Sequence, residues 1–259
     1  MHNATLAPPK RSASIRLCTA LLVVLNCGIA ASQTSEKSNA EPSTKLRTLI
    51  CLRDAQGKGV VKLLEGERTI WTIGDLKTPK HAELLANGNV LIAESGASPW
   101  PERLQVTERT ADGEVVWKHD VRDPRACFRL KDGRTAIIAE RRSFTVDKDG
   151  NRQFRDVVVG NDIELPLTRG GGMLADGSIG MLRHGEDDFK LVEITEDGKT
   201  RTTSIKINDG HPADGIFAER PNGHLLIPQT YANQVIEIDR DRKKVTTFAE
   251  LNRPRGVQL

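Results

Sequence analysis

The chain has 259 residues, with 38 Lys and Arg against 35 Asp and Glu, and this length suits one large domain or two small ones. The excess of positive charge comes from Lys10, Arg11 and Arg16, whereas the residues from Ala31 onward carry equal numbers of basic and acidic side chains. The mildly basic balance is therefore a feature of the N-terminal segment and not evidence of nucleic-acid binding, which we do not expect.

The first 31 residues have the organisation of a secretory signal peptide. The three basic residues precede an apolar run, Leu17 to Ala30, which is followed by two small residues. The run is too short for a transmembrane helix, so we predict cleavage near Ala30 to Ser32 and export to the periplasm or the medium. Lipid anchoring through Cys27 is the minor alternative, because the bulky Asn26 before it suits lipid attachment poorly.

The stretch from residue 32 to 45 is polar and has no apolar periodicity, which predicts a disordered linker ahead of a single domain over residues 46–259. That domain opens with three strand-like runs, LRTLICLR, GVVKLLEG and RTIWTIGD. Cys51 lies in the first run and Cys127 in a later apolar run. An oxidising compartment permits a disulfide, but positions inside apolar strands favour two buried, unpaired thiols.

From residue 81 onward, an apolar strand, a polar corner with glycine and a second apolar strand recur four times. The corner glycines are Gly88, Gly133, Gly177 and Gly223, at spacings of 45, 44 and 46 residues. Asn-Gly and Asp-Gly between apolar runs are typical of β-hairpins. A second polar corner follows in each unit, at Gly113, Gly150, Gly198 and Arg242. Each unit therefore has four short antiparallel strands, which is the size and pattern of a propeller blade.

The two ends of the domain complement each other. The opening segment has three strands and lacks a first one, whereas Arg253 to Leu259 looks like a first strand that stands alone. We therefore predict an all-β fold, a β-propeller of five four-stranded blades whose C-terminal strand pairs into the N-terminal blade and closes the ring. A six-bladed ring is the alternative, but no remaining segment is long enough to supply another blade.

The repeats resemble those of bacterial quinoprotein-like, arylsulfotransferase-like and NHL-type propellers, including gluconolactonase-type ones. The stretches LLANGNVLIAES, RTADGEVVW and PNGHLLIPQTYANQVIEIDRD carry this resemblance, which covers nearly all of residues 46–259. The pattern is specific for blade architecture and not for an activity. The resemblance also places Trp71 and Trp117 at the outer-strand tryptophan position of a blade, where we expect packing between sheets.

Cationic residues recur at the predicted start of the first strand of each blade, which lines one mouth of the central channel. Lys80, Arg125 and Arg169 each lie eight residues before a corner glycine, and the match of RGVQL to KHAEL places Arg255 in the same row. In the remaining unit the position is Gly215. The row predicts a site for a small anionic ligand such as a carboxylate, sulfate or phosphate ester. The alternative is a ring of solvated rim residues, since Lys and Arg are frequent in this chain.

His211 and Asp214 lie just before Gly215, and His81 follows Lys80. We add Asp214 to the predicted ligand-binding residues because of this position. The resemblance to arylsulfotransferase-like propellers implies an enzymatic alternative, a transferase that uses channel histidines. His211 or His81 would then be the nucleophile or general acid/base, with an arginine of the row stabilising oxyanions. Those enzymes are much longer than this chain, which contains no full motif of theirs.

The resemblance to gluconolactonase-type propellers implies instead a hydrolase with a channel metal, for which the candidate ligands are Glu83, Asp162, Glu164 and Asp214. These carboxylates do not recur at matching positions, and neighbouring cations would repel a metal ion, so we predict neither a metal site nor another cofactor. The preferred function is an exported, monomeric binding or scaffold protein. It would hold a small anionic ligand or a protein partner at the channel mouth.

Overall fold

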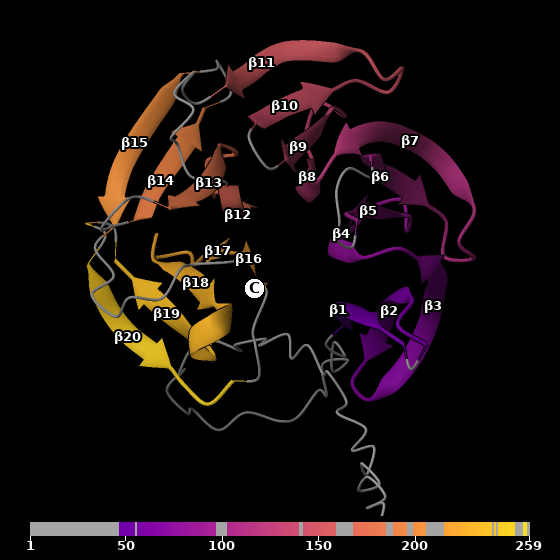
Figure 1. The fold of residues 1–259 in the computed structure, drawn as a ribbon, viewed down its shortest axis with the longest axis horizontal. Coiled ribbons are helices and arrows are strands. Elements are labelled where there is room, and N and C mark those ends of the chain that lie inside the picture. The colour runs from indigo at the N-terminus through magenta and orange to yellow at the C-terminus, as the bar shows by residue number, and fades with distance from the viewer. Residues whose placement is uncertain are drawn as a thin grey trace, which may run out of the picture.

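The chain forms a ring of five β-sheets, seen along its axis in Figure 1. The computed structural model describes residues 47–54, 56–96, 103–139, 142–158, 168–184, 189–195, 199–205, 215–239, 241, 243–251 and 256–257. The predicted signal peptide and linker lie outside these residues. The sheets follow one another in chain order around a central axis, so the predicted β-propeller of five blades is confirmed.

Each blade is built from consecutive antiparallel strands. The first blade contains β1 (Arg47–Arg53), β2 (Gly59–Glu65) and β3 (Arg68–Leu76). The second contains β4 (Pro79–Leu84), β5 (Val90–Glu94), β6 (Arg103–Arg109) and β7 (Val115–Arg122). The third contains β8 (Pro124–Arg129), β9 (Thr135–Ala139), β10 (Arg142–Val146) and β11 (Arg152–Val158).

The last two blades share a connection near the axis. The fourth contains β12 (Thr168–Met173), β13 (Ile179–His184), β14 (Phe189–Ile194) and β15 (Thr200–Ile205). The fifth contains β17 (Ala218–Glu219), β18 (Leu225–Gln229), β19 (Gln234–Ile238) and β20 (Lys244–Phe248), with the 3₁₀ helix η1 (Thr230–Ala232) between β18 and β19. β16 (Gly215–Ile216) leads into the fifth blade and pairs with β12 of the fourth.

The predicted hairpin corners share one geometry. The glycines at residues 88, 133, 177 and 223 all have φ between 81° and 85°, a left-handed conformation that favours glycine. The preceding Asn or Asp closes each turn, because its side-chain oxygen accepts the N–H two residues on, at 3.0, 3.0, 2.8 and 3.0 Å in chain order. The Asn-Gly and Asp-Gly pairs therefore set the register of the first two strands in the four blades that follow the first.

Apolar side chains fill the spaces between neighbouring blades. In β5, Val90 and Ile92 pack against the first blade, whereas Leu91 and Ala93 pack with residues of the third. Alternate residues of a strand point to opposite faces of its sheet, so both faces of the blade are buried. All four side chains are fully buried, and each of the three larger ones contributes about 1.5–3 kcal/mol to folding.

The tryptophans and cysteines occupy the places that the sequence suggested. Trp71 and Trp117 lie on the outer strands β3 and β7 and are partly buried against the clusters between blades, so their predicted packing role is confirmed. Cys51 and Cys127 are free thiols, as predicted, although only Cys127 is fully buried. Burial raises the pKa of Cys51 to about 12, so its thiolate form is negligible at neutral pH.

Three successive glycines on β12 allow the inner strands of the fourth and fifth blades to pair directly. Gly170 and Gly171 pair in parallel with Gly215 and Ile216 of β16. A Cβ atom on Gly170 would overlap with the carbonyl oxygen of Gly215, so a larger residue does not fit. The run of glycines in RGGGML therefore serves close approach of two backbones, as the sequence suggested.

The described C-terminal residues join this parallel arrangement near the axis. Gly256 forms a parallel bridge with Ile216, and the backbone nitrogen of Val257 donates to the carbonyl oxygen of Ile216 at 2.9 Å. We predicted that this segment pairs with the first blade, whereas its described partner is the strand that leads into the fifth. Residues 253–255 and 258–259 lie outside the described part of the chain, so pairing with β1 stays a prediction.

Candidate ligand-binding mouth

The predicted row of cations occupies equivalent places in the inner strands. Lys80, Arg125 and Arg169 are the second residues of β4, β8 and β12. These parallel inner strands begin at one end of the ring, which we call the mouth. Of this row, the structure describes the side chains of Lys80 and Arg125, whereas the side chain of Arg169 and all of Arg255 lie outside the described residues. His211 and Asp214 lie outside them as well.

A continuous series of hydrogen bonds links the first three blades at the mouth. Arg53, at the end of β1, donates from Nη2 to Oγ1 of Thr78 at 2.8 Å. The carbonyl oxygen of Thr78 accepts the N–H of Ser95 at 3.0 Å. Ser95 Oγ donates to Oδ1 of Asp123, and Arg125 Nη2 donates to its Oδ2 at 2.6 Å. We call these five residues the mouth chain, and an arginine stands at each of its ends.

The positive charge of the mouth chain is only partly compensated. Asp123 neutralises Arg125, and both side chains are 26% exposed. Nε of Arg125 is enclosed and has no acceptor among the described residues. Arg53 is exposed, and its described hydrogen bond goes to a neutral hydroxyl. A guanidinium presents a planar fork of donors that matches carboxylate and phosphate oxygens, so Arg53 can bind an anion without giving up an ion pair.

A further cation lies buried at the same end of the fourth blade. Arg183 on β13 is opposite Thr168, the first residue of β12, and is 6% exposed. Burial lowers the pKa of its guanidinium from the usual value, because the charged form is desolvated. The guanidinium nevertheless stays charged at neutral pH.

His81, the first histidine considered as catalytic, faces the third blade from β4. Its Nδ1 accepts the backbone N–H of Cys127 at 3.3 Å, and its ring lies 4.7 Å from that of Phe128. Burial lowers the pKa of the imidazole to about 4, so it is neutral at pH 7. Because Nδ1 accepts, the proton of this neutral ring belongs on Nε2. The described contact is thus structural, and a role in proton transfer stays a prediction.

Glu83 repeats this arrangement two residues farther along β4. Its Oε2 accepts the backbone N–H of Arg129 at 2.8 Å, and burial raises the pKa of the carboxyl group. His81 and Glu83 therefore occupy two N–H groups, also two residues apart, on the channel-side edge of β8. We call this pair of side chains the inner clasp, because it joins the inner strands of the second and third blades.

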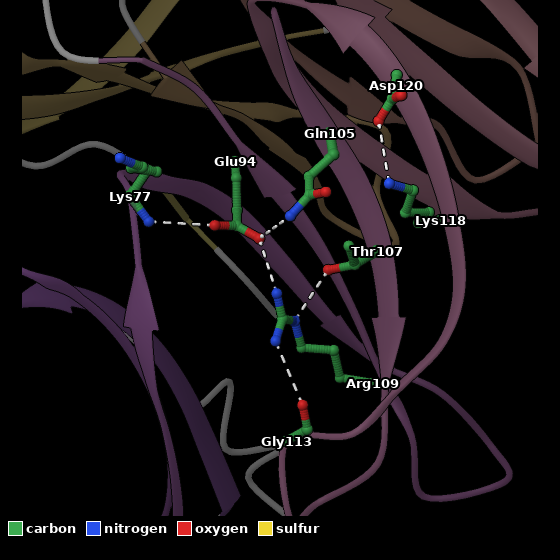
Figure 2. Close-up of polar contacts among 8 residues, drawn as sticks. All are labelled: Lys77, Glu94, Gln105, Thr107, Arg109, Gly113, Lys118 and Asp120. Carbon is green, nitrogen blue, oxygen red and sulfur yellow. Dashed lines mark hydrogen bonds and ion pairs between the residues drawn. The ribbon is translucent and has the colours of Figure 1, made fainter.

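A separate polar cluster lies in the second blade, beside its connection with the first (Figure 2). Oε1 of Glu94 accepts from Arg109 and from Gln105, each at 3.2 Å, and Oε2 accepts the N–H of Lys77 at 3.1 Å. Arg109 also donates to Thr107 and to the carbonyl oxygen of Gly113. The side chain of Glu94 is only 3% exposed, and its ion pair with Arg109 joins β5 and β6 within the second blade. The N–H of Lys77 ties this pair to the segment that leads in from the first blade.

The carboxylates considered as metal ligands do not form a metal centre in the described part of the chain. Within it, no group of three or more His, Cys, Asp and Glu side chains could hold a metal ion. The carboxylate of Glu83 is engaged by Arg129, and Asp162, Glu164 and Asp214 lie outside the described residues.

In the same part of the chain, no helix is long and apolar enough to cross a membrane.

The sequence interpretation missed four of the five members of the mouth chain. Thr78 and Asp123 stand at the same place, directly before the proline of an inner strand, in the stretches TPK and DPR. Alignment of these two stretches would have shown a recurring polar position. Arg53 is the last residue of β1 and Ser95 directly follows β5, and only the contacts across blades place them at the mouth.

No protein-family model and no curated protein sequence match this chain. Solved propellers are similar in structure. Virginiamycin B lyase from Staphylococcus aureus has 13% identity and a TM-score of 0.55, with 80% of this chain and 73% of that chain covered. A chain of a nidogen/laminin complex has 15% identity and a TM-score of 0.56, covering 76% and 75%. A gluconolactonase from Xanthomonas campestris has 14% identity and a TM-score of 0.55, covering 79% and 77%.

At such identities the likeness shows the fold alone. It confirms the propeller fold that the resemblance noted from the sequence implies. The likeness to arylsulfotransferases stays a prediction.

Proposed function

We propose that the protein is an exported β-propeller that binds a small anionic ligand at its mouth. The observation that carries this proposal is the mouth chain, which ends in Arg53 and Arg125 and contains a single carboxylate, Asp123. One anion at the mouth would add charge-assisted hydrogen bonds to Arg53, whose described partner is uncharged. The ligand class is a carboxylate, a sulfate or a phosphate ester.

The backbone at Asp123 supports a binding role for this segment. Asp123 has φ of 46°, a left-handed conformation that is uncommon for a residue other than glycine. Such conformations persist where the surrounding contacts hold them, and they gather at functional sites. Ser95 and Arg125 supply those contacts by binding both oxygens of the Asp123 carboxylate.

Isothermal titration of the mature protein with phosphate, sulfate and small carboxylates tests the proposal. We expect binding that Arg53→Ala and Arg125→Ala each weaken by about tenfold or more, since each removes a charge-assisted hydrogen bond. Arg68→Ala is the matched control, because Arg68 is an exposed arginine of the first blade that pairs with Glu65 away from the mouth chain. The proposal would be wrong if no anion bound to the protein, or if all variants bound the anions with equal affinity.

Export is a separate part of the proposal and has its own test. We expect the full-length chain, expressed with a C-terminal tag, to be recovered from the periplasm or the medium with an N-terminus near Ala30 to Ser32. Mass spectrometry of the intact protein would also reveal a lipid on Cys27. A tagged protein that keeps residues 1–30 inside the cell would contradict this part alone.

The enzymatic alternative would need His211 or His81 as nucleophile or general base. The lone pair of Nδ1 in His81 is engaged by Cys127, and His211 lies outside the described residues. No described contact favours a transferase or a hydrolase, so the binding protein is the function that we propose.

A further inference from the structure

The outer edge of the second blade is open to a partner. The sheet of this blade ends at β7, and Figure 1 shows β7 along the outer margin of the ring. The strand has eight residues and no proline, so its outward N–H and C=O groups can pair with another strand. Val116 on this strand is 53% exposed, and Lys118 and Asp120 are 59% and 66% exposed.

The residues of β7 are complementary to themselves in one antiparallel register. If two copies meet with the His119 residues opposite each other, Lys118 faces Asp120 of the partner subunit, and the same pair recurs on the other side of the axis. Val116 then faces the aliphatic stem of Arg122, and Trp117 faces Val121. Lys118 and Asp120 thus form opposite-charge pairs and Trp117 and Val121 form apolar pairs, both of which stabilise neighbouring strands.

Neighbouring registers lack this complementarity. A two-fold axis perpendicular to a sheet keeps each face on its own side, so only residues of the same parity can lie opposite. Centring the axis on Lys118 places that cation opposite itself, and centring it on Asp120 places that acid opposite itself. Like charges directly opposite are unfavourable. An axis on Val121 would pair Asp120 with Arg122 but would overlap only residues 120–122 of the strand, so charge and overlap together favour the register centred on His119.

The outer strands of the fourth and first blades do not offer the same pattern. The exposed residues of β15 in the fourth blade are Thr200, Arg201, Thr202 and Ser204, and none of them is acidic. On β3, placing Arg68 opposite Asp75 would require residues of different parity to face each other, which the two-fold axis forbids.

We propose that two copies of this chain associate through their β7 strands, paired antiparallel about a two-fold axis at His119. The second blades then form one continuous sheet across the dimer. Within one chain, the exposed side chains of Lys118 and Asp120 form an ion pair at 3.8 Å. In the dimer, each of them pairs instead with the opposite charge of the other copy, and Val116 becomes covered. This proposal departs from the monomer expected from the sequence and does not depend on the ligand.

Sedimentation equilibrium of the mature protein tests the dimer. We expect the wild type to associate and Lys118→Asp to raise the dissociation constant by roughly tenfold or more, because two attractive pairs become repulsive. The double variant Lys118→Asp/Asp120→Lys should restore association, since it only reverses the charges. Thr202→Asp on β15, an exposed outer-strand position of the fourth blade, is the matched control and should leave association unchanged.

Three results would overturn the proposal. The first is a wild type that stays monomeric up to its solubility limit, and the second is a Lys118→Asp variant that associates like the wild type. The third is a charge-reversed variant that stays monomeric although circular dichroism shows it to be folded.

Discussion

Nδ1 of His81, on the inner strand of the second blade, accepts the backbone N–H of Cys127, on the inner strand of the third, at 3.3 Å. An inner strand has a free edge toward the channel, so its N–H groups need acceptors from outside its own sheet. Between the second and third blades, the side chains of the inner clasp, His81 and Glu83, supply these acceptors. Between the fourth and fifth blades, the backbone supplies them, because β12 pairs directly with β16.

Replacing His81 by Ala should destabilise the protein, because it leaves the N–H of the buried Cys127 without an acceptor. An unsatisfied buried donor costs about 1–3 kcal/mol, which we expect as the loss in the free energy of unfolding in urea. His81→Asn is the matched control, since its Oδ1 can take the place of Nδ1, and it should retain part of the stability. Equal losses in both variants would show that the bond to Cys127 is not what stabilises the clasp.

The stability of the protein should also depend on pH through His81. Burial lowers the pKa of its imidazole from 6.5 to about 4, so between these values the unfolded chain binds the proton more readily. The contribution of His81 is fully present above the unfolded value and is lost as the pH falls through this range, on the order of 3 kcal/mol in total. The measurement is the free energy of unfolding of the wild type and of His81→Asn across the range.

The comparison with His81→Asn separates His81 from Glu83, which acts with the opposite sign. Burial raises the pKa of the Glu83 carboxyl group, so its contribution is lost as the pH rises through the raised value. Because both proteins contain Glu83, its effect cancels in their difference. A difference that stays constant with pH would contradict the lowered pKa of His81.

Gly170 tests the direct pairing of the fourth and fifth blades. Gly170→Ala should lower the free energy of unfolding by about 1–3 kcal/mol or more, because its Cβ would overlap with the backbone of Gly215. Gly74→Ala on the outer strand β3 is the matched control. Its Cβ would meet no atom within 4 Å, so its effect should be small. Thermal unfolding of both variants makes the comparison, and similar melting temperatures would show that β12 and β16 need no close approach.

The fold could be predicted because its signals are local. Each corner glycine lies in a turn whose Asn or Asp stands next to it in the sequence, so the period of about 45 residues marks every blade from the second to the fifth. The closing strand depended on the two ends of the chain, which no local signal connects. There the described contact of Gly256 is with Ile216 and not with the first blade.

The candidate site could be predicted only in part, for a similar reason. The cations Lys80 and Arg125 were found because they repeat at one distance from a corner. Asp123, which neutralises Arg125, lies only two residues before it, but its role depends on Ser95 of the preceding blade. Bonds between residues 25 and 28 positions apart decide which charges at the mouth are compensated, and a repeat pattern does not contain this information.

The buried ion pair between Glu94 and Arg109 leads to the last prediction (Figure 2). Arg109→Met should lower the free energy of unfolding by about 3–5 kcal/mol, because it leaves the buried carboxylate of Glu94 without its countercharge. Adding Glu94→Gln should recover much of this loss, since a neutral amide no longer needs a countercharge. Its oxygen can accept the N–H of Lys77, and its NH2 can donate to Gln105 once that side-chain amide has turned over. Lys58→Met, which breaks an exposed ion pair with Asp75, is the control and should change stability little. Urea unfolding of the wild type, Arg109→Met, Glu94→Gln and the double variant gives the coupling between Glu94 and Arg109. A double variant that is less stable than Arg109→Met would mean that the charge of Glu94 is balanced by another group.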